Sequence, residues 1–245
     1  VTQILTDGKW RRAASSEDGV GMAFGMTVQS RPRATEDPAD LVGRPLRDVA
    51  ALAKSWNFED AGIGMAAVNS YHSHPVRALA HGFRPCKENN WARTFHPYAP
   101  LVAGKRVAVI GHFPFAEAAL ATAGEYICLE RNLQPGDWPD SACEYVLPEC
   151  DLVFISSSSF VNKTAPRLIE LSRQAHTVLV GPSTPLNPVL LDYGVDPNTG
   201  FSAARSPHRP APFLLPSPPS PSAVLPRVKT PPTPASITSA YRLFQ

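Results

Sequence analysis

The second half of the chain places residue types that can do chemistry directly after short apolar runs. His112 follows the run "VAVIG", Glu130 closes "EYICLE", and serines at 156–159 follow "LVFI". An imidazole can act as a general acid, a general base or a metal ligand, and a carboxylate accepts hydrogen bonds from hydroxyls. These residues are therefore the first candidates for a site, provided that the fold brings them together.

The apolar runs themselves predict the elements that would position these residues. They have the continuously hydrophobic, β-branched character of buried parallel strands. Four such runs alternate with helix-forming segments between Lys105 and about Gly200. This alternation predicts βαβ units, and hence a parallel sheet with helices on both faces. Because ligands bind outside the carboxyl ends of strands in such sheets, we expect the residues after the strands to share one edge.

The loop after the first of these strands departs from a dinucleotide fingerprint. Gly111 stands at the first glycine of G-x-G-x-x-G, but Phe113 and Ala116 occupy the other two glycine positions. A phenylalanine there keeps the backbone away from a pyrophosphate, which argues against a standard NAD enzyme. Glu130, 19 residues after Gly111, could hold ribose hydroxyls, or it could be a strand-end carboxylate paired with Arg131 or another surface base.

Histidines offer a second kind of site, one for a metal ion. His112 could be a ligand, an acid–base group, or a turn residue that donates to a carbonyl. His72 and His74 follow a predicted helix, but no firm zinc spacing surrounds them, and solvated loop histidines are the alternative. Cys128 lies inside a predicted strand, where a free thiol behaves as a small hydrophobe. The serines at 156–159 lack a G-x-S-x-G elbow, so ligand-binding hydroxyls are favoured over a nucleophile.

The first hundred residues have a different pattern. Strands are expected near "TQILT" and "GVGMAFGMTV", followed by helices near 46–55 and 57–73, the second with Asn57 as its N-cap. Glycines and alanines at 62, 64, 66 and 67 give the second helix an unusually small face, so we expect another backbone to approach it closely. Strands followed by helices predict a separate α+β domain.

Composition limits the class of protein. The chain has 245 residues, 43% of them hydrophobic, which suits one large domain or two small ones. The first 200 residues carry 18 basic and 21 acidic side chains, so they give no electrostatic footprint for nucleic acid. No apolar stretch approaches the ~18 residues of a membrane span. Four cysteines without a C-x-x-C pair favour a reduced protein, and a cytoplasmic location is the default expectation.

A proline-rich segment follows the predicted sheet. Eleven prolines fall between Ser206 and Pro234. This composition predicts a disordered or polyproline tail without sheet or helix. A proline-rich ligand for aromatic grooves is the less favoured interpretation. The expected organisation is an α+β domain over 1–98, a parallel-sheet domain over 99–203 and a disordered tail over 204–245.

Five segments together resemble a known prokaryotic family. They are "GIGMAAVNS", "VAVIGHFPF", "LERNLQPGDWPD", "CDLVFISSSSFVNKT" and "GPSTPLNPVLLDYGVD", in this order. The chain resembles the heavy-metal chelation domain family, long catalogued as a domain of unknown function, over roughly residues 15–200. The resemblance implies an enolase-N-terminal-like α+β domain joined to a Rossmann-like domain, with a candidate site in the cleft between them.

The resemblance also implies a set of ligand-binding positions. They comprise the end of the small-faced helix and the loops after the strands: Asn69, Gly111, His112, Phe113, Pro114, Glu130, Asn162, Thr164, Gly181, Pro182, Ser183 and Thr184. The sequence departs from the family beyond about Phe201, where the proline-rich segment takes the place of the expected end of the domain.

Two functions stay open at this point. In the first, a chelation-related protein binds a small polar ligand or a ligand–metal complex between the domains, with a transition or heavy-metal ion held by His112, or by His72 and His74. In the second, a transferase or lyase acts on a nucleoside-like or aromatic molecule, with His112 as acid–base group and Glu130 on the ribose. The expected partner is a small molecule or metal, without nucleic acid or membrane, and a homodimer is left open.

Overall fold

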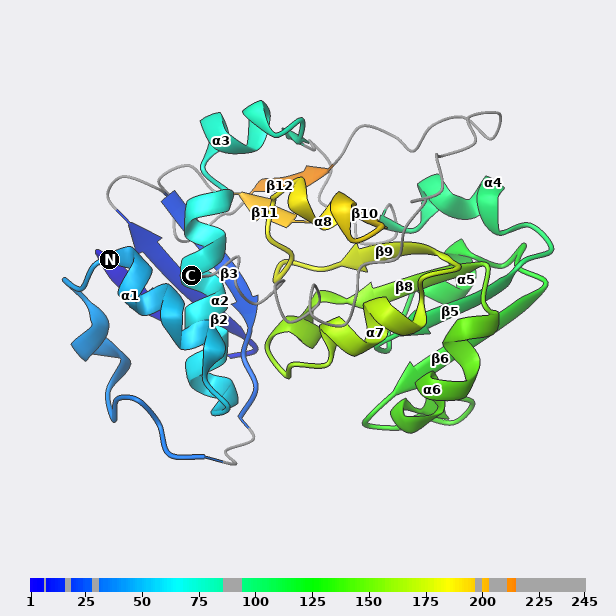
Figure 1. Ribbon diagram of the computed structural model, residues 1–245, viewed down its shortest axis with the longest axis horizontal. Helices are drawn as coiled ribbons and strands as arrows, with labels where there is room; N and C mark the ends of the chain where they lie inside the picture. The colour runs from blue at the N-terminus through cyan, green and yellow to red at the C-terminus, as the bar shows by residue number, and fades with distance from the viewer. Residues whose placement is uncertain are drawn as a thin grey trace.

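The structure is a computed structural model that describes residues 1–6, 8–15, 19–27, 31–85, 94–196, 200–202 and 211–214. An antiparallel sheet and a parallel sheet lie at opposite ends of the molecule in Figure 1. The expected fold class, an α+β part followed by a parallel α/β part, is confirmed. Within the described ranges, no helix combines the length and the apolar character that crossing a bilayer requires.

The antiparallel sheet is a three-stranded meander. It consists of β1 (Gln3–Leu5), β2 (Trp10–Ser15) and β3 (Gly19–Phe24), in that order. The pattern predicts β1 and β3 but misses β2, because Arg11 and Arg12 interrupt its apolar residues. Arg11 is nevertheless buried, and its guanidinium lies 3.9 Å from the carboxylate of Glu59.

Short helices and one long helix follow this sheet. They are η1 (Pro38–Leu41), α1 (Leu46–Ala50), η2 (Ala51–Lys54), α2 (Phe58–His72) and α3 (Pro75–Ala80). The expected N-cap of α2 is present, since the side chain of Asn57 accepts from the backbone N–H groups of Glu59 and Asp60.

The small face of α2 packs directly against other backbone, as expected. A methyl group at Gly64 would overlap the backbone of Ala53, and a methyl group at Gly21 of β3 would overlap the backbone of Ser70. Only glycine permits these approaches. Helix α2 is thereby held close to η2 and to the antiparallel sheet, in front of which it lies in Figure 1.

The parallel sheet has six strands in the order β10-β9-β8-β5-β6-β7, and every pair is parallel. Its bounds are β5 (Arg106–Ile110), β6 (Glu125–Glu130), β7 (Trp138–Pro139), β8 (Leu152–Ser156), β9 (His176–Val180) and β10 (Val195–Asp196). The four longer strands confirm the sequence pattern. The edge strands β7 and β10 were not predicted, because two residues are too few to show a periodicity.

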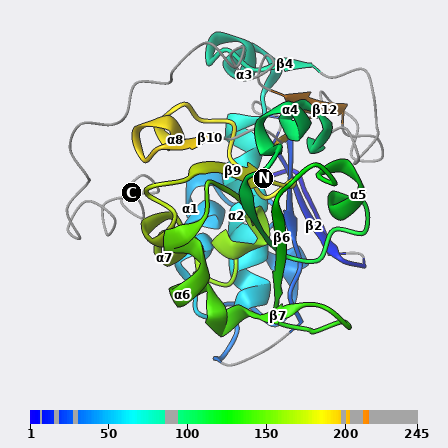
Figure 2. The ribbon, with the colours of Figure 1, turned by 90° about the vertical axis from the view of Figure 1, so that its right-hand side faces the viewer.

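Helices cover both faces of this sheet (Figure 2). One face packs on η4 (His96–Tyr98), α4 (Ala99–Val102) and α5 (Ala116–Ala119). The other packs on α6 (Cys143–Val146), η6 (Leu147–Glu149), α7 (Ala165–Leu171) and α8 (Val189–Asp192). The short elements η5 (Asp140–Ala142) and η7 (Ser157–Phe160) complete the connections.

The order of the strands reverses at β5. The chain runs from β5 to β6 on one side and then returns to β8 on the other side of β5. In open parallel sheets, the carboxyl ends of strands at such a reversal form the usual ligand-binding crevice. The loop after β5, which carries His112, therefore starts at the position that the topology favours for a site.

A third, small sheet corrects the expectation for the proline-rich segment. It contains β11 (Gly200–Ser202), β12 (Ala211–Leu214) and β4 (Arg84–Pro85), in that order. The prediction of no sheet after Ser206 is therefore wrong for Ala211–Leu214. Only one residue of β12 lacks a backbone N–H, so a short ladder can still form. The rest of the predicted tail, and Cys86, lie outside the described residues.

The close packing of α2 gives a graded test. Gly64→Ala should destabilise the fold by about 2–3 kcal/mol, because the added methyl group would overlap the backbone of Ala53. Gly62→Ala should change stability by about 1 kcal/mol or less, because its nearest contacts, at 3.0 and 3.2 Å, can be partly offset by the better helix propensity of alanine. Urea denaturation of the two variants measures this, and equal stabilities would contradict the packing.

Candidate functional site

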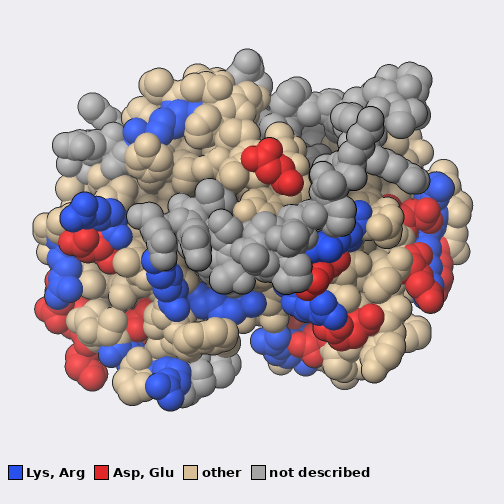
Figure 3. Space-filling model, in the orientation of Figure 1, with Lys and Arg blue, Asp and Glu red and all other residues tan. Residues whose placement is uncertain are grey.

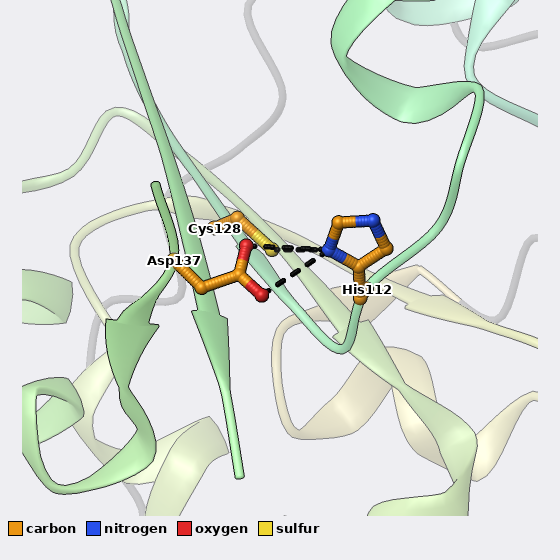
Figure 4. Close-up of side chains that lie close together, drawn as sticks. All are labelled: His112, Cys128 and Asp137. Carbon is orange, nitrogen blue, oxygen red and sulfur yellow. Dashed lines mark hydrogen bonds and ion pairs between the residues drawn. The ribbon is translucent and has the colours of Figure 1, made fainter. Parts of the chain in front are cut away.

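The loop after β5 turns sharply at Gly111. This residue has φ +101°, and its backbone N–H donates to the carbonyl of Leu129 at 2.9 Å, which extends the pairing of β5 with β6. A Cβ at position 111 would lie 3.0 Å from the Cβ of Ser156. Conformation and space therefore both favour glycine here. The turn directs the next side chain, His112, toward β6 (Figure 4).

Three side chains meet beyond this turn. The Nδ1 atom of His112 lies 3.2 Å from both carboxylate oxygens of Asp137 and 3.8 Å from the Sγ atom of Cys128. One ligand atom from each residue lies within 4.8 Å of the other two. The close-up in Figure 4 shows the carboxylate and the thiol on the same side of the imidazole ring.

Different elements hold the three residues. Cys128 belongs to β6 and is buried, while Asp137 lies between a turn at Gly136 (φ +97°) and strand β7. The backbone N–H of Gln134 donates to Oδ2 of Asp137 at 2.9 Å, which fixes the carboxylate. The side chain of Asp137 is 4% exposed and that of His112 is 32% exposed. The cluster is therefore buried on the side of the sheet and open to solvent at the imidazole.

Burial, hydrogen bonds and neighbouring negative charge together set the electrostatics of the cluster. Burial, a hydrogen bond to Asp137 and the charges of Asp137, Glu130 and Glu117 raise the pKa of the Cys128 thiol to about 12. Burial alone would raise the pKa of Asp137, but hydrogen bonds from Gln134, Cys128 and His112 outweigh it and lower that pKa. The site thus combines an ionised carboxylate with a protonated thiol, and it favours cations over anions.

The donor set fits a transition or heavy-metal ion. Nitrogen, sulfur and oxygen ligands bind Zn²⁺ at about 2.0–2.3 Å, which places tetrahedral ligands about 3.3–3.8 Å apart. The observed separations of 3.2 and 3.8 Å are close to this range. In the Nε2–H tautomer, the imidazole presents its Nδ1 lone pair to the same space as the thiol and the carboxylate. Three protein ligands would leave one coordination position open to solvent.

The same geometry argues against a nucleophilic triad. In a Cys–His–Asp triad, one ring nitrogen contacts the thiol and the other contacts the carboxylate. Here the single Nδ1 atom of His112 faces both groups. A thiol with its pKa raised to about 12 is also protonated, and the thiolate is the nucleophilic form.

Comparisons with known proteins bear on this site. A family model described as "Putative heavy-metal chelation" (DUF364) matches residues 95–204, and a second model with the same description (DUF4213) matches residues 9–72. The crystal structure of a DUF364-family protein from Desulfitobacterium hafniense is 39% identical and has a TM-score of 0.74, with 82% of this chain and 80% of that chain covered. This protein belongs to the DUF364 family.

A more distant DUF364-family structure, from Pyrococcus horikoshii, shares the fold. It is 20% identical, has a TM-score of 0.63, and covers 84% of this chain and 87% of that one. A comparison with curated proteins gave no match. The family resemblance and the fold class expected from the sequence are thus confirmed. The family description supports heavy-metal chelation as the general kind of function.

Most of the family-derived residues after β5 and β6 do come together. The backbone N–H of His112 donates to Oε2 of Glu130 at 2.8 Å. Phe113 packs against Phe95, with ring centroids 5.5 Å apart, so it belongs to the core beside the site, whereas Pro114 is exposed.

A second group of these residues lies at the junction between the two main sheets. Asn69 donates through Nδ2 to the carbonyls of Met22 and Pro182, at 2.7 and 3.1 Å. Ser183 accepts from the backbone N–H of Phe24 at 2.8 Å. Thr184 is also buried, and Gly181 adopts φ +118° at the start of the loop. These contacts join the loop after β9 to α2 and β3.

Two buried oxygens at this junction are relevant to the predicted ligand-binding role of these residues, which stays a prediction. The Oδ1 atom of Asn69 and the Oγ1 atom of Thr184 have no hydrogen-bond partner within the described part of the chain. Contacts between loops connect this junction to the cluster at His112. Gly111 lies against Ser156, and the hydroxyl of the next residue, Ser157, accepts from the N–H of Ser183 at 3.1 Å.

A third group surrounds the start of α7. Oδ1 of Asn162 accepts from the N–H of Thr164 at 3.2 Å and from its hydroxyl at 2.7 Å. Between them Lys163 adopts φ +69°, the one positive φ of a non-glycine residue in the described ranges. Its Nζ donates to the carbonyl of Ala53, at the end of η2, and burial lowers its pKa to about 8. This loop also joins the parallel sheet to the N-terminal helices.

The other histidines proposed as metal ligands do not join the cluster. His72 lies at the end of α2, where its Nδ1 is 3.5 Å from Asn187 and its ring centroid is 6.5 Å from that of His81. Burial and the nearby His81 lower the pKa of His72 to about 4. His74 precedes α3, and neither residue belongs to the metal-competent group found in the described part.

Sequence reasoning missed two members of the cluster, Cys128 and Asp137. Cys128 is indeed buried in a strand, but its thiol contacts His112 and Asp137 in addition to core residues. Its position two residues before Glu130 was an available signal, since residues i and i+2 of a strand share a face. Asp137 gives no comparable signal, because the turn at Gly136 decides where its carboxylate lies.

Lys163 gives a test of the junction through pH. Burial lowers the pKa of Lys163 from its ordinary value of 10.5 to about 8 in the folded protein. Between these two values the unfolded chain binds more protons, so stability rises with pH. Relative to Lys163→Met, the free energy of unfolding of the wild type should increase by about 2 kcal/mol from pH 7.5 to 10, and by less where solvent screens the partly exposed ammonium group. Denaturant titrations at several pH values measure this, and a constant difference would contradict burial of the ammonium group.

Proposed function

We propose that this protein binds a transition or heavy-metal ion through His112, Cys128 and Asp137. The observation that carries the proposal is the convergence of an imidazole nitrogen, a thiol and a carboxylate, all within 4.8 Å of one another. The family description of heavy-metal chelation supports the same general function.

The kind of ion follows from the donors. Thiolate and imidazole ligands favour soft or borderline metals such as Zn²⁺, Cd²⁺ or Cu⁺, whereas Mg²⁺ and Ca²⁺ prefer all-oxygen sites. Because the pKa of Cys128 is raised, its thiol keeps its proton at neutral pH. A cation must therefore displace this proton in order to bind the sulfur. A hard ion, with little affinity for sulfur, would not do so.

The open side of the cluster accommodates a small polar ligand. His112 is the exposed member, and three protein ligands leave a coordination position for a group from solvent or from a chelating molecule. A ligand–metal complex would approach between the 1–98 and 99–203 parts, because the loops after β5, β8 and β9 run from the cluster to the junction.

The position of Glu130 favours this proposal over a ribose-binding enzyme. Oε1 of Glu130 accepts from the N–H groups of Arg131 and Asn132, at 2.6 and 3.1 Å, and Oε2 accepts from that of His112 at 2.8 Å. A carboxylate has about four lone-pair sites, so three are engaged and one is left. Two ribose hydroxyls would need two.

Removal of the thiol should abolish tight binding. Changes around metal ligands cost about 10–100-fold in affinity, so Cys128→Ala, which deletes a ligand, should weaken Cd²⁺ binding by more than about 100-fold. The thiolate-to-cadmium charge-transfer absorption should disappear with it. Cys143→Ala is the matched control, since Cys143 is an equally buried thiol in the core packed on α6. Loss of the absorption in the control but not in Cys128→Ala would refute the assignment.

Metal binding should also release a proton. The Cys128 thiol, with a pKa of about 12, is protonated at pH 8, whereas Asp137, with its lowered pKa, is already ionised. Coordination of the thiolate should therefore release about one proton, and affinity should fall about tenfold for each pH unit below 8. Calorimetry in buffers of different ionisation enthalpy counts the protons. Binding heats that do not depend on the buffer would contradict thiolate ligation.

A further inference from the structure

We infer that Glu130 is the positioning residue of the metal site: its carboxylate clamps the backbone of His112 so that the imidazole faces Cys128 and Asp137. The inference rests on the proposed function and assigns Glu130 a role through His112, with no direct contact to the ion. It replaces the ribose-binding role considered from the sequence.

The contacts of Glu130 are to backbone on both sides of the site. Oε2 accepts from the N–H of His112 at 2.8 Å, and Oε1 accepts from the N–H groups of Arg131 and Asn132. One carboxylate therefore ties the loop after β5 to the loop after β6. Charge-assisted bonds of this kind are shorter and stronger than neutral ones, so the clamp restricts the backbone at His112.

Strand geometry makes this clamp specific for the cluster. Cys128 and Glu130 are two residues apart on β6 and so project from the same face. The strand carries the thiol and, one step farther along the same face, the group that holds the histidine backbone. The remaining restraint on the loop comes from Gly111, whose N–H donates to Leu129. Without Glu130, the loop would keep that bond but lose the one that is specific to His112.

Position and charge can be separated by three variants. Glu130→Gln keeps the size of the side chain, but its amide N–H₂ must face one of the backbone donors. Glu130→Asp keeps the charge but is shorter by one methylene, so it cannot span both loops. Glu117→Gln is the matched control, because the charge of Glu117 also raises the pKa of Cys128 while no hydrogen bond joins it to His112 within the described contacts.

The experiment titrates the full chain and each variant with Cd²⁺ and follows the ring nitrogens of His112 by ¹⁵N NMR. The wild type should bind with a shift of the Nδ1 resonance. Both Glu130 variants should bind about 10–100-fold more weakly with a reduced Nδ1 shift, as expected for outer-sphere residues, while Glu117→Gln stays within about threefold. Thermal unfolding of the metal-free variants serves as the folding check.

Each outcome has a distinct meaning. Wild type that does not bind Cd²⁺ would overturn the proposed function itself. Wild-type binding that is unchanged in both Glu130 variants would overturn only the positioning role. If Glu130→Gln and Glu117→Gln lost Cd²⁺ affinity equally while Glu130→Asp kept it, the effect would be due to charge. That result would also overturn the positioning role of Glu130. If Glu130→Gln fails to fold, Glu130→Asp and the control decide the question by the same criteria.

Discussion

The register of β5 against β6 is the constraint on which the site depends. Val109 pairs with Cys128 and Ile110 with Leu129, and the N–H of Gly111 continues the ladder. Ile127 and Leu129 pack into one core cluster, so Cys128 between them projects to the opposite face. If β6 slipped by one residue relative to β5, the thiol of Cys128 would point into the core that now holds Ile127 and Leu129. The same slip would move Glu130 away from His112. Core packing on both faces thus fixes the chemistry at the edge.

A second set of contacts holds the antiparallel sheet and α2 against the edge of the parallel sheet. Asn69, Ser183 and Lys163 each reach a backbone group of another element. The glycines of α2 and β3 allow α2 itself to lie close to β3 and η2. The charges on the face shown in Figure 3 are of both signs and interspersed, so no single-sign field dominates it. At the proposed metal site, the negative charge that would attract a cation comes from Asp137 and its neighbours.

The sequence predicts the regular parts of this structure better than its site. The long strands β5 and β8 are predicted by their apolar runs, and helix α2 is predicted by its N-cap Asn57. In these elements the local sequence pattern agrees with the tertiary packing. His112 and Glu130 were also found, since they directly follow strands. Cys128 was missed because a cysteine in an apolar strand has the pattern of a core residue, and Asp137 was missed because the turn at Gly136 decides where its carboxylate lies. Strand β12 was missed because the segment around it is proline-rich and because one of its two partners, β4, is far away in sequence.

X-ray absorption of the zinc-loaded protein tests the central claim most directly, because it reports the atoms bound to the ion. The account predicts one sulfur neighbour at about 2.3 Å, together with nitrogen or oxygen neighbours at about 2.0–2.2 Å. A shell made only of nitrogen and oxygen would contradict it, since Cys128 would not be a ligand. Two or more sulfur neighbours would contradict it as well, because the cluster holds a single thiol.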